Sequence, residues 1–414
     1  MENNINFYDW LCLRLPLILL FANGYFIYRL FVITKLTDVF VFRSLQRSQG
    51  SINRLCLYII GAAALLSFFI PNAVTVLILL PILKTIDQDI ALQAGEHRIT
   101  TALTLSTIYG ANIGGMGSLI GSPANLLLIG ALDLYEVPGR EQIGFFNWFV
   151  WSVPLVALFV AAAWAMVAML AVPRKAQKMS VTLNGMEDHK NLSLEQRSGL
   201  LIFVLFLGFW IMESVLKEFI PGFDAVDLPA CICFFTLFLY LVFVRHFGVS
   251  GKPLLRPKDI FTGFPRRGIL FLCLLAVVIS VVRFFQIDKQ ISDLFSSVIR
   301  PDTPGFLIIL FTIMTVILLT EFLSNTLVST AFFSITYFIS TAHNIPPLIL
   351  MIAVSIASTC AFMTPVATPC NALAFGEMKG TSFRMMLVSG FLLNIIGAFL
   401  MSVWLQFIIP FIYH

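Results

Sequence analysis

The sequence predicts an all-α polytopic membrane protein made of two inverted repeats, each with a re-entrant hairpin and a broken transmembrane helix. The composition is the first reason: 59% of the 414 residues are hydrophobic and 12% are charged, whereas soluble domains carry about 25% charged residues. Second, two long apolar runs contain stretches rich in Gly, Pro and Asn, at Gly114–Asn125 and Ala361–Asn371. Third, a shorter polar interruption precedes each of them, at Pro71–Ala73 and Ser324–Thr326.

These interruptions occur in matched pairs, one pair in each half of the chain. The longer stretches also end alike, since Ser-Pro-Ala-Asn at 122–125 aligns with Thr-Pro-Cys-Asn at 368–371. A bilayer core holds no water for unpaired backbone groups, so a broken helix persists there only where protein or a polar cavity surrounds it. Paired interruptions of this kind indicate the binding site of a transporter.

The first half begins with a span, a surface helix and the hairpin. Leu11–Thr34 is apolar and long enough to cross a bilayer. Lys35–Ser48 mixes charged and apolar residues, which is typical of an amphipathic helix on the membrane surface. Pro71 divides Leu55–Leu83 into arms of about fifteen and about eleven residues, both shorter than the roughly 20 needed to span. We therefore expect a re-entrant hairpin with Pro71 and Asn72 at its tip.

The broken helix follows, and the same order of elements returns in the second half. Ile99–Leu132 is long enough to cross despite its break, and Phe146–Val172 is predicted to be an unbroken span before the polar loop Pro173–Arg197. Three spans, an odd number, separate the copies, so the second copy is predicted to be inverted and its hairpin to enter from the opposite side. The remaining expected elements are the spans 198–216, 225–244 and 268–282, the surface helix 287–299, the interrupted run 305–339, the broken helix 346–376 and the last span 385–412.

Basic residues assign the two sides of the membrane. Arg174–Arg197 holds five Lys and Arg, and Arg245–Arg267 holds six, so both loops are expected in the cytoplasm. Asp133–Asn147 and Lys217–Asp227 each hold one basic and three acidic residues, which suits the outside. The first hairpin then enters from the cytoplasmic side and the second from the outer side, as inversion requires.

The broken segments offer a neutral, oxygen-rich pocket. Helix N-termini suit anionic oxygens and helix C-termini suit Na⁺, and Asn, Ser and Thr side chains add further oxygens. Glu321 is the only carboxylate in the four broken segments, whereas proton-driven carriers usually place an ionisable group in the membrane. We interpret Glu321 as a structural partner rather than a cation ligand. Ordinary transmembrane helices also contain Gly, Pro, Ser and Thr, so it is the matched pairing, more than any single residue, that favours Na⁺-coupled anion transport.

Four motifs in and around the breaks match a known family pattern. They are LLSFFIPNAVTVLILLPIL at 65–83, GANIGGMGSLIGSPANLLLIG at 110–130, TEFLSNT at 320–326 and PVATPCNALAFG at 365–376. These motifs resemble the divalent-anion/sodium symporter family of the citrate transporter-like, ion transporter superfamily. The resemblance implies a scaffold domain that forms a homodimer and a transport domain that moves as an elevator. The implied divisions are a scaffold helix and surface helix at 1–50, the first transport repeat at 51–173, a cytoplasmic loop with scaffold helices at 174–303, and the second transport repeat at 304–414.

The resemblance also implies which residues bind Na⁺ and the substrate. The residues expected at the first Na⁺ site are Ser67, Asn72 and the backbone of Gly121, and those expected at the second are Thr320, Asn325 and the backbone of Leu323 and Ala367. The residues expected to contact the substrate, some from the pocket argument above, are Asn72, Ser122, Pro123, Asn125, Asn325, Thr326, Thr368, Pro369 and Asn371.

Two features depart from the family pattern. The first hairpin contains Pro71, Asn72 and Ala73 where the family has Ser-Asn-Thr, so one hydroxyl is lost from the expected Na⁺ site and one from the expected carboxylate cradle. One span precedes the first surface helix, whereas three precede the second. The identity of the anion, the number of Na⁺ ions and the choice between a reduced scaffold and a truncated start therefore stay open.

The sequence as a whole predicts a secondary active transporter of the plasma (inner) membrane, not an enzyme. The expected function is Na⁺-coupled uptake of a dicarboxylate or other divalent anion. Its partners would be the small anion, Na⁺, the lipid bilayer and a second copy of the chain, with no cofactor besides the coupling ion. The alternative is an arsenite exporter or Na⁺/H⁺ antiporter of the same superfamily.

The chain has no H-E-x-x-H, no G-x-S-x-G and no paired membrane aspartates, which argues against an intramembrane enzyme. Its basic residues gather in a few loops, which argues against nucleic-acid binding.

The expected topology can be tested by cysteine labelling. Single cysteines that replace Asn184 and Asp224 in a cysteine-free background should react with a membrane-impermeant thiol reagent from opposite sides. The cysteine at 224 should react in intact cells, and the cysteine at 184 only when the cytoplasmic face is opened. Labelling of both from the same side would contradict the inverted arrangement.

Overall fold

The computed structural model describes residues 7–47, 51–94, 99–173, 192–220, 222–247, 251–261, 290 and 303–413. Within these ranges, five helices are long and apolar enough to cross a membrane. The described chain also contains one short antiparallel pair, β1 (His246–Phe247) with β2 (Lys252–Pro253). The predicted all-α membrane architecture is confirmed. The predicted span 268–282, the surface helix 287–299 and Asn184 lie outside the described residues.

The chain divides into two compact units. The first consists of Met1–Phe40, Gly144–Asn147 and Glu187–Pro265, and the second of Val41–Ile143, Trp148–Met186 and Arg266–His414. Every residue predicted to bind Na⁺ or the substrate belongs to the second unit. The scaffold and transport roles predicted for the segments of the chain stay predictions.

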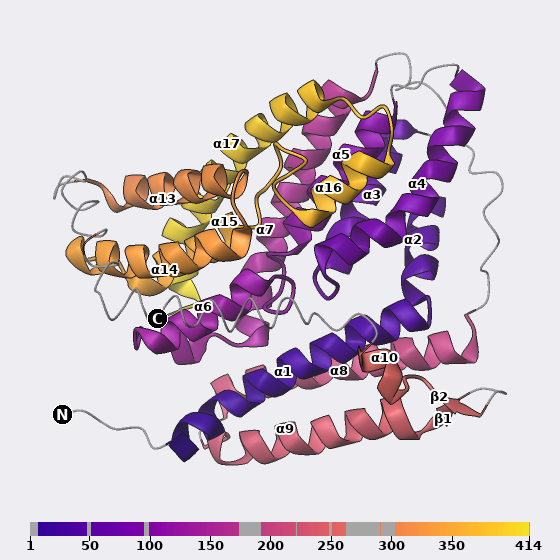
Figure 1. Ribbon diagram of the computed structural model, residues 1–414. Coiled ribbons are helices and arrows are strands. Elements are labelled where there is room, and N and C mark those ends of the chain that lie inside the picture. Colours follow the sequence, from indigo (N-terminus) through magenta and orange to yellow (C-terminus); the bar gives the residue numbers. More distant parts are fainter. Residues whose placement is uncertain are drawn as a thin grey trace. The chain divides into compact units, whose positions relative to one another are not determined.

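Long helices joined by aromatic contacts form the described part of the first unit. Its helices are α1 (Phe7–Ile33), α8 (Leu194–Phe219), α9 (Asp224–Leu239, continued by a π-turn at Tyr240–Val244) and the short α10 (Pro257–Phe261) (Figure 1). Phe31 of α1 packs edge-on against Phe203 of α8, and Phe26 stacks with Phe238 of α9. The all-apolar faces of these helices therefore bury one another within this unit.

The first half of the second unit contains the predicted hairpin and the first broken helix. Its helices are α2 (Leu36–Gln46), in which the first unit passes into the second, α3 (Ile52–Ser67), α4 (Asn72–Ala94), α5 (Ile99–Gly114) and α6 (Pro123–Leu134). The turn between α3 and α4 lies where Pro71 predicts it. The prediction of a short second arm was wrong, because α4 has 23 residues and continues past Leu83. The stretch 84–94 contains neither Gly nor Pro, so nothing in it ends the helix.

The second half repeats this arrangement. Its elements are α13 (Gly305–Thr320), α14 (Asn325–Ala342), α15 (Pro347–Ala357), α16 (Pro369–Glu377), α17 (Phe383–Phe407) and η5 (Ile409–Phe411). The first half ends with η1 (Arg140–Gln142) and α7 (Phe145–Met166, continued by a π-helix at Val167–Ala171). Side chains at Ser122, Ser324 and Thr368 accept hydrogen bonds from the first turns of α6, α14 and α16. Pro123 and Pro369 take the first helical position of α6 and α16. These are local signals for helix starts, which is why the sequence places the breaks correctly.

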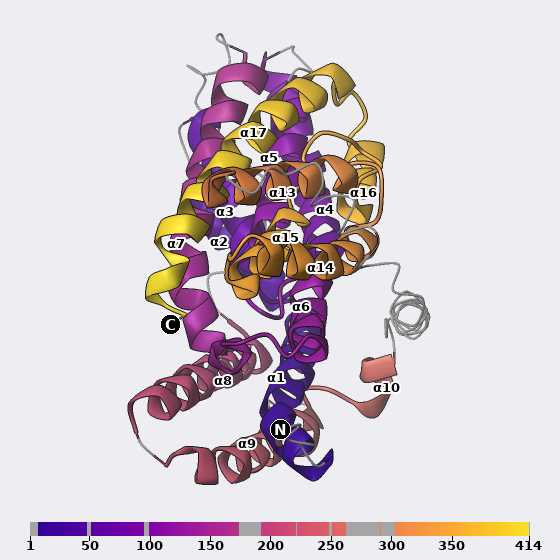
Figure 2. The ribbon, with the colours of Figure 1, turned by 90° about the vertical axis from the view of Figure 1, so that its left-hand side faces the viewer.

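The hairpins and broken helices of the second unit pack by one rule. The first arm of each hairpin contacts the first part of the broken helix in its own half, α3 with α5 and α13 with α15. The second arm contacts the last part of the broken helix in the other half, α4 with α16 and α14 with α6 (Figure 1). Figure 2 shows α13, α15 and α14 packed closely together. The tips and the breaks of both halves are thereby brought into one unit.

The helices α3 and α5 approach each other closely at a glycine. A Cβ atom on Gly110 would lie 2.5 Å from the carbonyl oxygen of Ile60 and 2.7 Å from the Cβ of Ala63. Backbone atoms cannot turn aside as the end of a flexible side chain does. Small residues at this position therefore let the two helix backbones meet.

We expect Gly110→Ala to destabilise the protein, because the added methyl group must push α3 away from α5. Overpacking of this kind costs about 1–3 kcal/mol, so the midpoint of thermal unfolding in detergent should fall by several degrees. Gly61→Ala in α3 is the matched control, since a Cβ there meets no atom within 4 Å. Equal midpoints for the two variants would contradict the close contact.

Candidate functional site

The tip of the first hairpin brings together the residues predicted for the first Na⁺ site. Ser67 is the last residue of α3 and Asn72 the first of α4. A Cβ on Gly121 would lie 3.1 Å from the carbonyl oxygen of Ser67 and 2.9 Å from that of Gly115. A Cβ on Gly115 would lie 3.4 Å from the Oδ1 atom of Asn72. Carbonyl and amide oxygens thus crowd around two glycines, which is the donor set that Na⁺ prefers.

At the tip of the second hairpin, the predicted Na⁺ residues likewise end one helix and begin the next. Thr320 ends α13 and its hydroxyl donates to the carbonyl of Ile317 at 2.9 Å, while Asn325 begins α14. Leu323 is exposed and Ala367 is buried in the second break. The hydroxyl of Thr320 keeps its oxygen lone pairs available, because it acts as the donor in its own helix.

An amide oxygen at each tip lacks a partner. The Oδ1 atoms of Asn72 and Asn325 are buried, and neither accepts a hydrogen bond from any described residue. A buried oxygen left without a partner costs about 1–3 kcal/mol. A cation placed against these oxygens removes that cost, so the two tips fit the predicted Na⁺ sites.

The two breaks are closed by asparagine side chains in the same way. Asn125 donates through Nδ2 to the carbonyls of Gly115 (3.2 Å) and Ser118 (2.8 Å), which lie 10 and 7 residues before it. Asn371 donates through Nδ2 to the carbonyls of Ala361 and Thr364, both at 2.9 Å and again 10 and 7 residues before it. Each carboxamide therefore satisfies carbonyls that the break frees, which a buried chain requires.

The oxygens of these two asparagines reach across to the other half. Asn125 Oδ1 accepts from the hydroxyl of Ser355 in α15 at 2.8 Å. Asn371 Oδ1 accepts from Nδ2 of Asn112 in α5 at 2.9 Å. Both asparagines are wholly buried. Predicted substrate residues in each break are thus held in place by the opposite half, so neither cradle is complete on its own.

Hydroxyl groups also join each break to the hairpin of its own half. Ser118 donates to the carbonyl of Phe68, and Thr364 donates to the carbonyl of Glu321 at 2.9 Å. Ser118 and Thr364 occupy equivalent positions, seven residues before Asn125 and Asn371 respectively. The contact between hairpin and break is therefore repeated as well.

Glu321 is a structural residue, as the sequence indicates. Its Oε1 atom accepts from the backbone N–H groups of Phe362 and Met363, both at 2.8 Å, and from Asn394 Nδ2 at 2.9 Å. Its Oε2 atom accepts from the N–H of Thr364 at 2.9 Å. Four donors thus stabilise a carboxylate that is wholly buried.

The remaining predicted substrate residues lie where helices begin after the breaks. Ser122 caps α6 and accepts from the N–H of Ala124 at 3.3 Å, and Thr368 caps α16 and accepts from the N–H of Asn371 at 3.2 Å. The residues that follow these caps, Pro123 and Pro369, are exposed, and Thr326 in the first turn of α14 is half-buried. Helix N-termini carry free N–H groups and partial positive charge, so each half contributes one helix end of the kind that suits an anion.

Comparison with known proteins identifies the family. The sequence model of the citrate transporter family matches residues 10–329. The chain belongs to the citrate transporter family. It is therefore a membrane transporter and not an enzyme, as the sequence predicts.

Individual known proteins also resemble the chain along most of its length. It is 29% identical to the sodium-dependent dicarboxylate transporter SdcS of Staphylococcus saprophyticus, over 87% of this chain and 70% of that protein. It is 27% identical to an uncharacterized transporter of Haemophilus influenzae, over 92% and 78%. It is 23% identical to the sodium-dependent high-affinity dicarboxylate transporter 3 of Caenorhabditis elegans, over 76% of this chain and 60% of that protein.

A solved structure shares the fold of this citrate transporter family member. The YdaH transporter of Alcanivorax borkumensis, described as having an unusual topology, superposes with a TM-score of 0.62. The match covers 96% of this chain and 85% of that one, at 14% sequence identity. The likeness supports the helical transporter architecture. The inverted orientation of the two halves stays a prediction.

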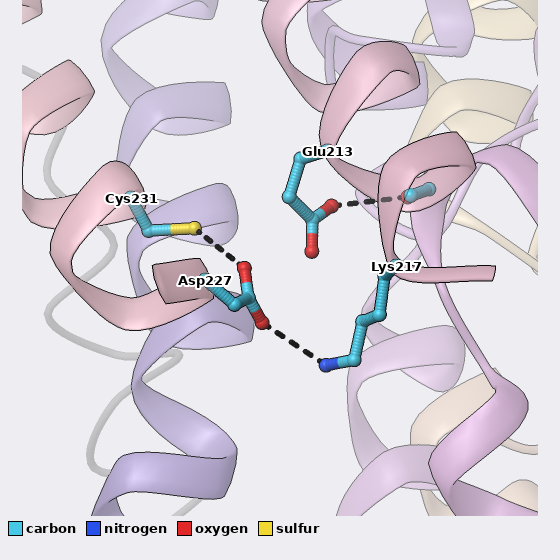
Figure 3. A network of polar contacts seen from close by, with 5 residues as sticks. Glu213, Lys217, Asp227 and Cys231 are labelled. Atoms are coloured by element: carbon cyan, nitrogen blue, oxygen red, sulfur yellow. Dashed lines mark hydrogen bonds and ion pairs between the residues drawn. The ribbon is translucent and has the colours of Figure 1, made fainter. Parts of the chain in front are cut away.

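A separate polar cluster, built on the buried residues Glu213, Asp227 and Cys231, lies in the first unit (Figure 3). The carboxylate of Asp227 in α9 accepts hydrogen bonds from Lys217 Nζ of α8 at 3.0 Å and from the thiol of Cys231 at 3.4 Å. The hydroxyl of Ser214 donates to Glu213 at 3.1 Å. One ligand atom each from Glu213, Asp227 and Cys231 lies within 4.8 Å of the other two. The cluster joins α8 to α9 by polar contacts inside a largely apolar unit. Its i, i+4 spacing on both helices was the signal available in the sequence.

Several residues of the site were not predicted from the sequence. They are the amide Asn112 and the hydroxyls that bind across elements, Ser118, Ser355 and Thr364, together with Asn394 on α17. Asn112 lies inside the motif at 110–130, where it could have been singled out as the one polar side chain of the last turn of α5. The others look like ordinary helix polar residues until their partners are known.

We expect Glu321→Ala to prevent folding or to lower the thermal midpoint far more than a typical core substitution. The change leaves three buried backbone N–H groups and one amide donor without their acceptor, at about 1–3 kcal/mol each. Glu377→Ala is the control, because that carboxylate forms an exposed ion pair with Lys84, and exposed pairs contribute little. The result that would count against this role is a Glu321→Ala protein as stable in detergent as Glu377→Ala.

Proposed function

We propose that the protein couples the uptake of a dicarboxylate or other divalent anion to Na⁺. The observation that carries the proposal is the pair of buried amide oxygens, Asn72 Oδ1 and Asn325 Oδ1, each without a hydrogen-bond partner in the part of the chain that the structure describes. Neutral oxygens hold a cation without a fixed anion, and the cation then attracts an anionic substrate. The sodium-dependent dicarboxylate transporters among the relatives support this assignment.

The anion fits the two helix N-termini that follow the breaks. Ser122 and Thr368 place a hydroxyl beside the first turn of α6 and α16, one from each half. An anion with two charged groups matches two such ends. In the proposed complex Asn125 and Asn371 hold the breaks in shape, and Thr326 adds a hydroxyl from the second hairpin.

The proposed transport step is an elevator movement of the second unit relative to the first. All proposed binding residues belong to the second unit, which has its own core. The first unit would be the scaffold and the contact between two copies in a homodimer, in the plasma (inner) membrane. A unit that contains all the proposed binding residues can move without separating them from one another.

The proton-linked alternative, a Na⁺/H⁺ antiporter, finds less support. Glu321 is the only carboxylate of the four broken segments, and its two oxygens already accept four hydrogen bonds. Protonation of Glu321 would remove acceptors from backbone groups that hold the second break. The side chain therefore suits a structural role better than proton transfer.

The test is binding of succinate, malate, citrate and sulfate to purified protein over a range of Na⁺ concentrations at constant ionic strength. Thr320→Ala should raise the Na⁺ concentration for half-maximal anion binding, and saturating Na⁺ should restore the affinity for the anion. Asn325→Ala should not be restored, because Asn325 is proposed to contact both ligands. Substrate and Na⁺ share one coupling free energy, so each must change the affinity of the other equally.

Thr315→Ala is the control for both variants, because Thr315 lies on α13, away from the tip, and in the described contacts its hydroxyl bonds only the carbonyl of Phe311. It should bind Na⁺ and anion like the wild type. Wild-type binding that is indifferent to Na⁺ but follows pH would refute sodium coupling and favour the proton-linked relative.

A further inference from the structure

Asn112 occupies the point where the two halves of the second unit meet. It lies in the last turn of α5 and is wholly buried. Its Nδ2 atom donates to the carbonyl of Ala361 (2.8 Å) and to Asn371 Oδ1 (2.9 Å) in the second break. Its Oδ1 atom accepts from Asn72 Nδ2 (3.4 Å) at the first hairpin tip and from the thiol of Cys370 (3.1 Å). One carboxamide thus spans from the first hairpin to the second break with both of its donors and its acceptor in use.

The direction of these hydrogen bonds is determined by the backbone of the second break. The carbonyls of Ala361 and Thr364 only accept, so Asn371 must turn its Nδ2 towards them and its Oδ1 towards Asn112. Asn112 must then donate to Asn371 and turn its own oxygen towards Asn72. Asn72 is left with its nitrogen as donor and its oxygen, which has no partner among the residues described, facing away from the chain of amides.

We infer that Asn112 is a positioning residue that makes Asn72 present its oxygen, rather than its NH₂ group, to the cation at the first hairpin tip. The inference rests on the proposed function, since it concerns how the same site couples Na⁺ to the anion. In this coupling, a movement of the α16 N-terminus when the anion binds beside Thr368 passes through Asn371 and Asn112 to Asn72. The first cation position is therefore linked to the anion cradle of the opposite half by direct hydrogen bonds.

The second half has no equivalent amide chain in the described contacts. Asn125 and Asn371 are 246 positions apart, so Ser358, which caps the end of α15, corresponds to Asn112. Its hydroxyl donates to the carbonyl of Ser355 in the last turn of α15. In the described contacts, Asn325 thus donates no bond to Ser358 like the one that Asn72 donates to Asn112. The two cation positions are predicted to differ, with only the first controlled from the opposite half.

The test measures a coupling factor, the ratio of the Na⁺ dissociation constants without and with a saturating anion. The anion is the member of the panel above that binds the wild type most tightly. Na⁺ affinity is taken from the Na⁺-dependent rise of the thermal unfolding midpoint, with choline keeping the ionic strength constant. Asn112→Ala removes the link and should lower the coupling factor about five- to tenfold, as expected for the loss of a buried hydrogen bond.

Thr107→Val is the matched control, because Thr107 is buried on the same helix and its hydroxyl bonds only the carbonyl of Leu103 in the described contacts. It should keep the wild-type coupling factor. Cys370→Ala removes one donor to Asn112 and leaves the amide chain, so its coupling factor should fall less than that of Asn112→Ala. If Asn112→Ala does not fold, Asn112→Ser is measured by the same criterion.

A purely structural role for Asn112 would weaken Na⁺ and anion binding together and leave their ratio unchanged, which would overturn the inference alone. A wild-type protein whose anion affinity does not depend on Na⁺ would instead refute the proposed function. The two failures are therefore separate results of one set of titrations.

Discussion

The second unit depends on one constraint, which is that the backbone freed at two helix breaks must find hydrogen-bond partners without water. A bilayer core provides none, and each unpaired carbonyl or N–H there is costly. Asn125 and Asn371 meet this need with the same two hydrogen bonds, to carbonyls 10 and 7 residues earlier. The breaks are thus ordered structures rather than flexible gaps, and the helix ends that they expose keep defined positions.

The two halves differ in the contacts that hold each hairpin against its break. In the second half the carboxylate of Glu321 binds three successive N–H groups of the break. In the first half the aromatic ring of Phe68 lies against the backbone at Gly117, where a Cβ would clash with it. The close packing of Phe68 on Gly117 and the hydrogen bonds of Glu321 therefore have the same effect. Each holds a hairpin against the break of its own half.

Interlocking between the halves has a consequence for the mechanism. Asn125 is held by Ser355, and Asn371 by Asn112, so each break needs the other half to be complete. The proposed coupling depends on this arrangement, because buried amides with all bonds made form a continuous hydrogen-bonded network across the unit. The polar groups at the tips and breaks are mostly neutral amides and hydroxyls. The carboxylate of Glu321 is occupied by its four hydrogen bonds to the second break and to Asn394.

The sequence by itself determined where the helices break and what kind of protein this is. Prolines, helix-capping Ser and Thr, and apolar runs of fixed length act over a few residues, so the tips at Asn72 and Asn325 and the helix starts after Ser122 and Thr368 were predictable. The length of α4 was not, because polar residues of good helix propensity continue a helix beyond the membrane-length part. Only the tertiary structure decided the partners of Asn112, Glu321 and Asp227, which come from the opposite half, from a distant helix or from a neighbouring span. Such contacts join residues far apart in the chain, and no local pattern records which of several buried polar side chains will meet.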